Sequence, residues 1–216
     1  EIYVTPEALE RSMSQPRLRE KLEQAGYETV DPQVFRKMSD TQAPQGILCV
    51  VERPKYSLEQ LLSGPTPLLV ALEDLRDPGN LGTIVRTGEG AGVTGIIMGQ
   101  GTVDIYNPKT IRATMGSIYR VPFVYTEDLG RAVGQMRERG IRVYAAHLAG
   151  EKDYDGFCYR KGTAFLIGNE GRGLSRELAQ CADSLLKIPM EGQVESLNAA
   201  VSAALLVYEA HRQRKK

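Results

Sequence analysis

The chain has 216 residues, of which 42% are apolar and 25% charged, and its 27 basic and 27 acidic side chains cancel. This composition is typical of a globular protein with one sizeable domain or a small domain joined to a larger one. Apolar runs such as Leu68–Leu72 are much shorter than a membrane span, and no secretory signal is recognisable, so we expect no membrane partner. Because the first residue is Glu1 and not Met, we expect an incomplete amino terminus.

The cysteines and histidines argue against a metal centre or a disulfide framework. Three cysteines, Cys49, Cys158 and Cys181, are odd in number and far apart, and only two histidines are present. Neither set has the spacing of a zinc site. We therefore expect no metal and a reducing, cytoplasmic location.

Residues 1–52 are predicted to form a small α/β unit. The expected elements are a strand at Ile2–Val4, helices at Pro6–Met13 and Pro16–Ala25, a strand at Thr29–Val30, a helix at Pro32–Met38 and a buried strand at Gly46–Val51. Residues 53–67 are rich in proline and are predicted to form a linker with one helical turn at Leu58–Leu62.

From residue 68 to residue 216, strand and helix patterns alternate. The strands are expected at Leu68–Leu72, Gly95–Met98, Val121–Tyr125, Arg142–Ala146, Ala164–Ile167 and Ser184–Ile188. The helices are expected at Leu81–Glu89, Pro108–Ile118, Leu129–Arg139, Ser175–Cys181 and Leu197–Arg212. Consecutive apolar positions in several strands indicate a sheet covered on both faces. The predicted fold class is α/β with a mostly parallel sheet flanked by helices.

One glycine motif suggests a dinucleotide site, but its context disagrees. Gly90–Gly95 satisfies G-x-G-x-x-G, whose glycines should follow a strand and open a helix. Here a helical pattern precedes the glycines and a strand follows. A nucleotide-dependent oxidoreductase is therefore the weaker alternative, and we expect these glycines to end a helix.

A second glycine segment is better placed for a ligand. Asp77–Gly82 follows the strand Leu68–Leu72 and opens a helix, with Asn80 expected as its cap. Arg86 lies off the apolar stripe of that helix, so a solvated surface arginine is the simplest interpretation of the residue alone.

Three loops near the carboxyl terminus form a third candidate region. Gly168–Gly173 and Pro189–Gly192 each follow a strand, and Ser196 precedes a helix rich in alanine, where it is expected to cap the helix or to serve the site. Glycines allow a ligand to approach the backbone closely.

Together these segments resemble the three motifs of the SpoU/TrmH family of RNA 2′-O-ribose methyltransferases, part of the SPOUT superfamily. The motif residues are Asn80–Gly82 with Arg86–Thr87, Ile167–Leu174, and Ile188–Met190 with Ser196–Ala200; Asn107–Lys109 and Arg112–Ser117 resemble the middle segment of the family. Residues 1–52 look like the later part of the SpoU-type substrate-binding domain.

The resemblance implies S-adenosylmethionine (SAM) as cofactor, a carboxyl-terminal trefoil knot, and a homodimer with active sites at the subunit interface. Ala146, His147, Gly168, Ile188, Met190 and Leu197 would line the cofactor pocket. Arg86 would be catalytic, and Asn80, Glu170, Ser196 and Asn198 would position substrate and loops.

The implied reaction is methylation of a ribose 2′-hydroxyl in RNA, with ribosomal RNA (rRNA) expected because of the amino-terminal unit. Transfer RNA, or a non-catalytic RNA-binding protein that retains the fold, remains an alternative. A guanidinium stays protonated, so stabilisation of the developing alkoxide is the expected role of Arg86, and a part in proton removal is its rival.

Overall fold

The computed structural model describes residues 1–193 and 196–215 and contains two compact units, Glu1–Pro54 and Lys55–Lys216. In the smaller unit, β1 (Ile2–Val4) is the central strand, parallel to β2 (Glu28–Thr29) and antiparallel to β3 (Ile47–Cys49). Its helices are α1 (Pro6–Ser12), α2 (Pro16–Ala25) and α3 (Pro32–Met38). They pack around a core centred on Val4, Ala8 and Leu22.

The expectation of a buried strand over Gly46–Val51 is wrong. Only Ile47–Cys49 pairs with β1, and Val50 and Val51 are 54% and 57% exposed. The reason is the position of β3 at the edge of a three-stranded sheet, where one side of the strand has no neighbour.

The larger unit contains a seven-stranded sheet in the order β6-β5-β4-β9-β7-β10-β8, and all the pairings described in it are parallel. The strands are β4 (Leu68–Leu72), β5 (Gly95–Gly99), β6 (Phe123–Thr126), β7 (Arg142–Ala146), β8 (Lys152–Asp153), β9 (Thr163–Ile167) and β10 (Ser184–Lys187). The helices are α4 (Leu58–Leu62), α5 (Pro78–Ala91), α6 (Pro108–Thr114), α7 (Leu129–Glu138), α8 (Arg176–Cys181) and α9 (Ala199–Arg214).

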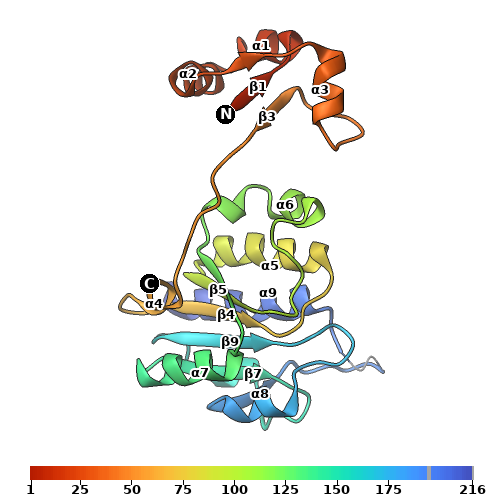
Figure 1. Ribbon diagram of the computed structural model, residues 1–216. Coiled ribbons are helices and arrows are strands. Elements are labelled where there is room, and N and C mark those ends of the chain that lie inside the picture. Colours follow the sequence, from red (N-terminus) through yellow and green to blue (C-terminus); the bar gives the residue numbers. More distant parts are fainter. Residues whose placement is uncertain (194–195, 216) are drawn as a thin grey trace. The chain divides into compact units, whose positions relative to one another are not determined.

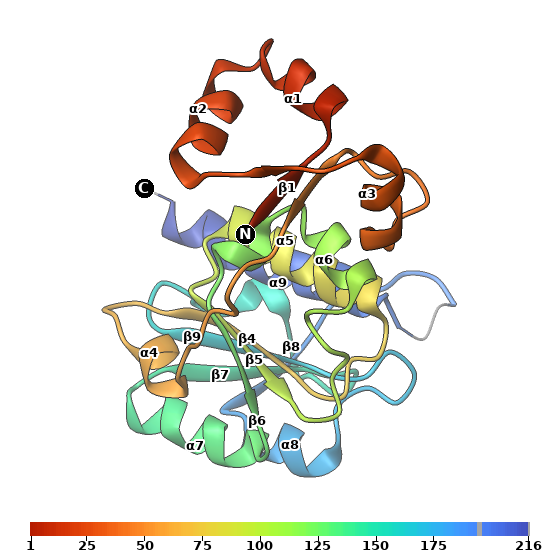
Figure 2. The same cartoon turned by 45° about the horizontal axis from the view of Figure 1, so that its top comes forward.

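Helices cover both faces of this sheet (Figures 1 and 2). Leu68, Val70 and Leu72 of β4 belong to the core under α5 and α9, whereas Leu69 and Ala71 belong to the core with α4, α7 and α8. Every residue of β4 is buried, because side chains alternate between two covered faces. The predicted class of the larger unit, a mostly parallel sheet flanked by helices, is confirmed.

The segment 55–67, expected to be a linker, packs into the larger unit. Ser57 and Gln60 form a capping box for α4, and Leu61 and Leu62 are buried. A Cβ at Gly95 would lie 2.6 Å from Leu61 Cγ, so the helix lies directly on β5.

Turns that contain a glycine end helices α5 and α6. Gly92 has φ +81° and closes α5, so the prediction that the Gly90–Gly95 motif ends a helix is confirmed. The expected helix Pro108–Ile118 ends earlier, at Thr114, because Met115 and Gly116 both have positive φ. A single 3₁₀ turn, Ser117–Tyr119, follows.

In the described part of the chain, no helix has the length and hydrophobicity needed to cross a membrane. The parallel arrangement places the carboxyl ends of β4, β7, β9 and β10 at one edge of the sheet, where the loops that follow them meet.

Candidate functional site

A cavity of about 300 Å³ opens where β7, β9 and β10 end, and it is lined by the loops that follow these strands. Its lining residues are Ala146, His147, Leu148, Ile167–Leu174, Lys187, Ile188, Met190, Ser196, Leu197, Ala199 and Ser202. All six residues expected to line a cofactor pocket are among them, as are Glu170 and Ser196. Of the other expected site residues, Asn80, Asn198 and Arg86 do not line this cavity.

Glycines shape the wall of the cavity because no side chain fits there. A Cβ at Gly168 would lie 2.2 Å from both the carbonyl carbon of Gly173 and the backbone nitrogen of Leu174. Asn169 and Gly173 exchange two backbone hydrogen bonds of 3.1 and 2.9 Å, which fold the segment between them into a tight loop. The pattern of glycines in the sequence therefore corresponds to close backbone packing beside the cavity.

Glu170 connects this loop to the start of α5. Its carboxylate accepts hydrogen bonds from the backbone N–H of Arg76 (3.1 Å) and of Asp77 (2.9 Å), and from the Asn80 side-chain amide (3.1 Å). Partial burial raises the pKa of Glu170, but these three donors together outweigh burial and hold that pKa below its ordinary value. Glu170 is thus a charged acceptor in the folded protein at neutral pH.

Asn198 extends the same network, because its Nδ2 donates to Asn80 Oδ1 over 2.9 Å. Its Oδ1 accepts from the backbone N–H of Ala200 and of Val201, so Asn198 caps α9. Asn80, Glu170 and Asn198 therefore form one hydrogen-bonded chain across three separate segments.

Two expected helix caps are wrong. Asp77, and not Asn80, caps α5: its Oδ1 accepts from the backbone N–H of Asn80 over 2.7 Å. Asn198, and not Ser196, caps α9, which begins at Ala199. In each case the capping side chain stands immediately before the first helical residue, and the helix begins at a different residue from the one predicted.

Sequence reasoning missed a second connection between these loops. Glu73, the residue after β4, accepts hydrogen bonds from both the backbone N–H and the hydroxyl of Ser175, each 2.6 Å long. The neighbouring Asp74 carbonyl accepts from Asn169 Nδ2 over 2.8 Å. Asn169, which begins the loop, and Ser175, two residues beyond its end, are thereby attached to the consecutive residues Asp74 and Glu73 after β4. The cap signal at Ser175 was visible in the sequence, but its partner 102 residues away was not.

Arg86 is exposed on α5, and its side chain makes no hydrogen bond and no ion pair with any described residue. Its guanidinium is therefore available to a group outside this chain. No cluster of three or more histidine, cysteine, aspartate or glutamate side chains able to hold a metal occurs among residues 1–193 and 196–215.

The fold and the site define a class: a parallel α/β domain with a ligand cavity beyond the carboxyl ends of its strands. The chain belongs to the SpoU rRNA methylase family, whose model matches residues 67–208. The predicted family is confirmed.

Three relatives illustrate this membership. The chain is 37% identical over 174 residues to 23S rRNA (guanosine(2553)-2′-O)-methyltransferase RlmP of Bacillus subtilis, covering 81% of this chain and 68% of the relative. It is 31% identical over 215 residues to 23S rRNA (guanosine-2′-O-)-methyltransferase RlmB of Neisseria meningitidis, covering 95% and 86%. The crystal structure of an AdoMet-bound rRNA methyltransferase from Sinorhizobium meliloti superimposes with a TM-score of 0.81 at 34% identity, covering 98% and 78%.

Proposed function

We propose that this protein transfers the methyl group of SAM to the 2′-oxygen of a ribose in rRNA. The observation that carries the proposal is the cavity at the ends of β7, β9 and β10, which gathers Ala146, His147, Gly168, Ile188, Met190 and Leu197 in a member of the SpoU family. Both relatives described above that match this chain in sequence are named as 23S rRNA 2′-O-methyltransferases.

The residues of the cavity fit SAM. Its volume of about 300 Å³ is at the lower end of the range for small-molecule sites. Ile188, Met190 and Leu197 supply apolar walls for a purine, and backbone N–H and C=O groups of the lining residues can bond to its edge. When bound, SAM supplies an activated methyl group on a sulfonium, so no metal is required for the transfer.

The protein must align the 2′-oxygen with that methyl group and assist loss of the hydroxyl proton. Alignment of reactants is worth several kcal/mol, roughly 7–11 in the best intramolecular systems. The exposed guanidinium of Arg86 is suited to stabilising the developing alkoxide and to anchoring the adjoining phosphate. Direct participation of Arg86 in proton removal is the rival role, for which a guanidinium is poorly suited because it stays protonated in proteins.

We further propose a homodimer in which Arg86 serves the cavity of the other subunit. Arg86 does not line the cavity of its own chain, and Val201 and Tyr208, two turns apart on α9, are each 48% exposed. A partner would cover these apolar side chains. The family resemblance also implies a trefoil knot in residues 68–216, which stays a prediction.

The small unit is proposed to bind the RNA substrate, as its likeness to the SpoU substrate-binding domain implies. The N. meningitidis rRNA enzyme aligns with 95% of this chain, a share that takes in most of that unit.

A cytoplasmic location is also proposed, because all three cysteines are free thiols, as in a reducing compartment.

The decisive experiment is tritium transfer from labelled SAM to unmodified rRNA, with transfer RNA as the parallel substrate. The wild-type protein should label rRNA, and Arg86→Ala should lower turnover at least 100-fold because an alkoxide-stabilising charge is lost. Calorimetry should show SAM binding by Arg86→Ala within about twofold of wild type. Parallel loss of SAM binding would make Arg86 structural, and absence of any transfer by the wild type would favour a non-catalytic RNA-binding protein.

A further inference from the structure

A second exposed arginine, Arg112, lies on α6, the helix next to the one that carries Arg86. Within the part of the chain that the structure describes, its side chain makes no hydrogen bond and no ion pair. The Lys109 side chain, one turn earlier, is 62% exposed, and its ammonium lies 3.6 Å from the Asp77 carboxylate. A surface pair at that distance contributes little stability, so the ammonium remains available to a stronger anion.

Helices α5 and α6 run side by side in the same direction (Figure 1). A Cβ at Gly82 would lie 2.5 Å from the Cβ of Ala113, and one at Gly79 would lie 3.7 Å from Lys109 Cε. Further along, Glu89 pairs with Arg120, beyond the end of α6. The contacts therefore follow the same order along both helices, as expected for helices that run parallel.

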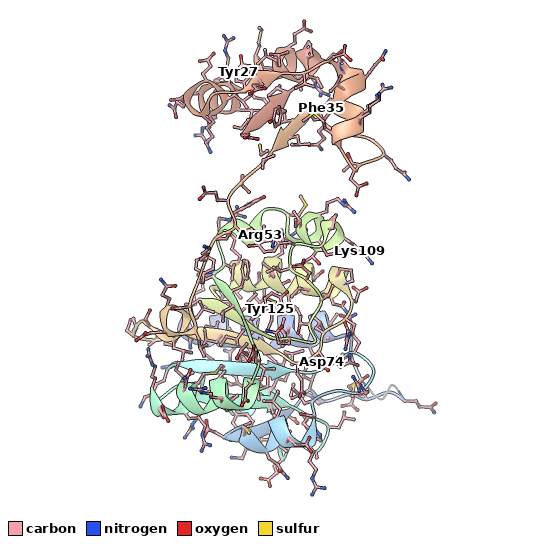
Figure 3. All side chains as sticks on the ribbon, viewed as in Figure 1. Tyr27, Phe35, Arg53, Asp74, Lys109 and Tyr125 are labelled. Carbon is pink, nitrogen blue, oxygen red and sulfur yellow. The ribbon has the colours of Figure 1, made fainter. Side chains whose placement is uncertain are left out.

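This pairing puts three cations on one flank. Gly79 and Arg86 are seven residues apart, which on a helix is two turns and a rotation of only about 20°. Lys109 and Arg112 are three residues apart and lie about 60° from each other on their helix. Because Lys109 lies against Gly79, Lys109 and Arg112 lie on the same side of the helix pair as Arg86. We call Arg86, Lys109 and Arg112 the cationic flank. Figure 3 shows Lys109 at the same side of the larger unit as Asp74, where β4 ends.

Helix stability does not account for the position of Lys109. It stands in the first turn of α6, where the partial positive charge of the helix end disfavours a cation. Arg112 in the last turn is favoured by the helix dipole, so its charge has a structural role that a test must separate.

The turn after Arg112 is strained. Met115 has φ +49° and is 68% exposed, and Gly116 follows with φ +86°. Residues other than glycine, asparagine and aspartate rarely adopt this conformation, and such strain concentrates at functional sites.

We propose that Lys109 and Arg112 bind the RNA phosphates next to the ribose that Arg86 addresses. The occupant is the RNA backbone, because the flank presents three cations, two of which have no side-chain partner among the described residues, and a guanidinium can bind phosphate oxygens with two parallel hydrogen bonds. The proposal rests on the proposed function, and it assigns a substrate-binding surface outside the cofactor cavity.

The test compares Arg112→Ala with Arg131→Ala in the full chain. Arg131 is also exposed, and its guanidinium has no partner among the described residues, but it lies on α7, on the opposite face of the sheet (Figure 1). Binding of a short single-stranded RNA is measured by fluorescence anisotropy over a range of salt, and KM for rRNA by tritium transfer. Arg112→Ala should weaken RNA binding roughly tenfold and reduce the salt slope by about 0.7–0.9, the value for one lost phosphate contact. Arg131→Ala should change neither.

Two further measurements separate phosphate binding from other roles of Arg112. Arg112→Lys, which keeps the charge at the end of α6, should restore most of the salt slope, and SAM affinity and oligomeric state should stay unchanged in all three variants. Equal salt slopes for Arg112→Ala and Arg131→Ala would overturn the proposal. So would a dimer that dissociates in Arg112→Ala, which would assign the flank to contact with a second copy. Because the anisotropy measurement needs no turnover, failure of methyl transfer would refute the proposed function without deciding this inference.

Discussion

Glu170 shows how a single side chain can hold two loops together. Its carboxylate accepts three N–H hydrogen bonds from the segment Arg76–Asn80, and the Asn80 side chain in turn accepts a hydrogen bond from Asn198. A charged acceptor is required because the three donors converge on two oxygens. The sequence predicted that Asn80, Glu170 and Asn198 matter, but the role of Glu170 as the common acceptor appears only in the structure.

Glu170→Gln should destabilise the protein and weaken its response to acid. An amide has one acceptor oxygen and turns an N–H toward donors, so we expect a loss of about 1 kcal/mol, or roughly 2–4 °C in Tm for a domain of this size. The pKa of Glu170 is lowered on folding. Its contribution is therefore present at neutral pH and lost as pH falls below the ordinary range of a carboxyl group and through the folded-state pKa.

The check is the Tm of both proteins from about pH 7 to about pH 2.5, a window that begins above the ordinary carboxyl pKa and extends well below it. The difference between wild type and Glu170→Gln should be largest near pH 7 and shrink on acidification. A difference that stays constant over this range would mean that the lost interaction does not depend on ionised Glu170.

At the scale of elements, the Gly168–Leu174 loop forms a wall of the cavity, and the shape of this wall depends on Gly168. Gly168 packs against the backbone of Gly173 and Leu174, and backbone cannot move aside as a flexible side chain can. Gly171 lies in the same loop, yet a Cβ there would meet only Asn169 Oδ1, at 3.6 Å. Substitution of Gly168 can therefore be compared with substitution of Gly171 in the same loop as a matched control.

Gly168→Ala should lower SAM affinity at least tenfold, because the wall of the cavity must shift to admit the methyl group. Gly171→Ala should bind SAM within about threefold of wild type, a change of less than roughly 0.7 kcal/mol. Isothermal titration calorimetry measures both. Equal affinities of the two variants would show that the loop deforms without altering the cavity.

At the scale of the whole molecule, the two units have separate cores. The two cores that enclose the seven-stranded sheet contain only residues of the larger unit, and the core around Val4, Ala8 and Leu22 contains only residues of the smaller one. The cavity likewise takes all its lining from the larger unit. Cofactor binding and the proposed RNA binding by residues 1–54 should therefore be separable.

A fragment of residues 55–216 should unfold cooperatively and bind SAM within about twofold of the full chain, since its core is complete. Its KM for rRNA should rise at least tenfold, because a tethered second binding surface raises the effective concentration of the substrate. Calorimetry and tritium transfer provide the two measurements. An unchanged KM would contradict the substrate-binding role of the small unit.

The sequence alone determined the local elements and the loops of the site. Strands β4 and β7 and helices α2, α3 and α4 begin and end where apolar periodicity, prolines and glycines predicted. These boundaries could be predicted because they depend on residues that are close together in the chain. The motif residues also predicted the family, which the comparison with residues 67–208 confirms.

The tertiary structure alone decided which loops meet and through which atoms. The bonds from Glu170 to Asn80, from Glu73 to Ser175 and from Asn198 to Asn80 join residues 90, 102 and 118 positions apart. They depend on the strand order β4-β9-β7-β10, which brings late strands beside early ones. Buried apolar strands pair through the backbone, so their side chains do not encode their neighbours, and only the packed sheet fixes the site.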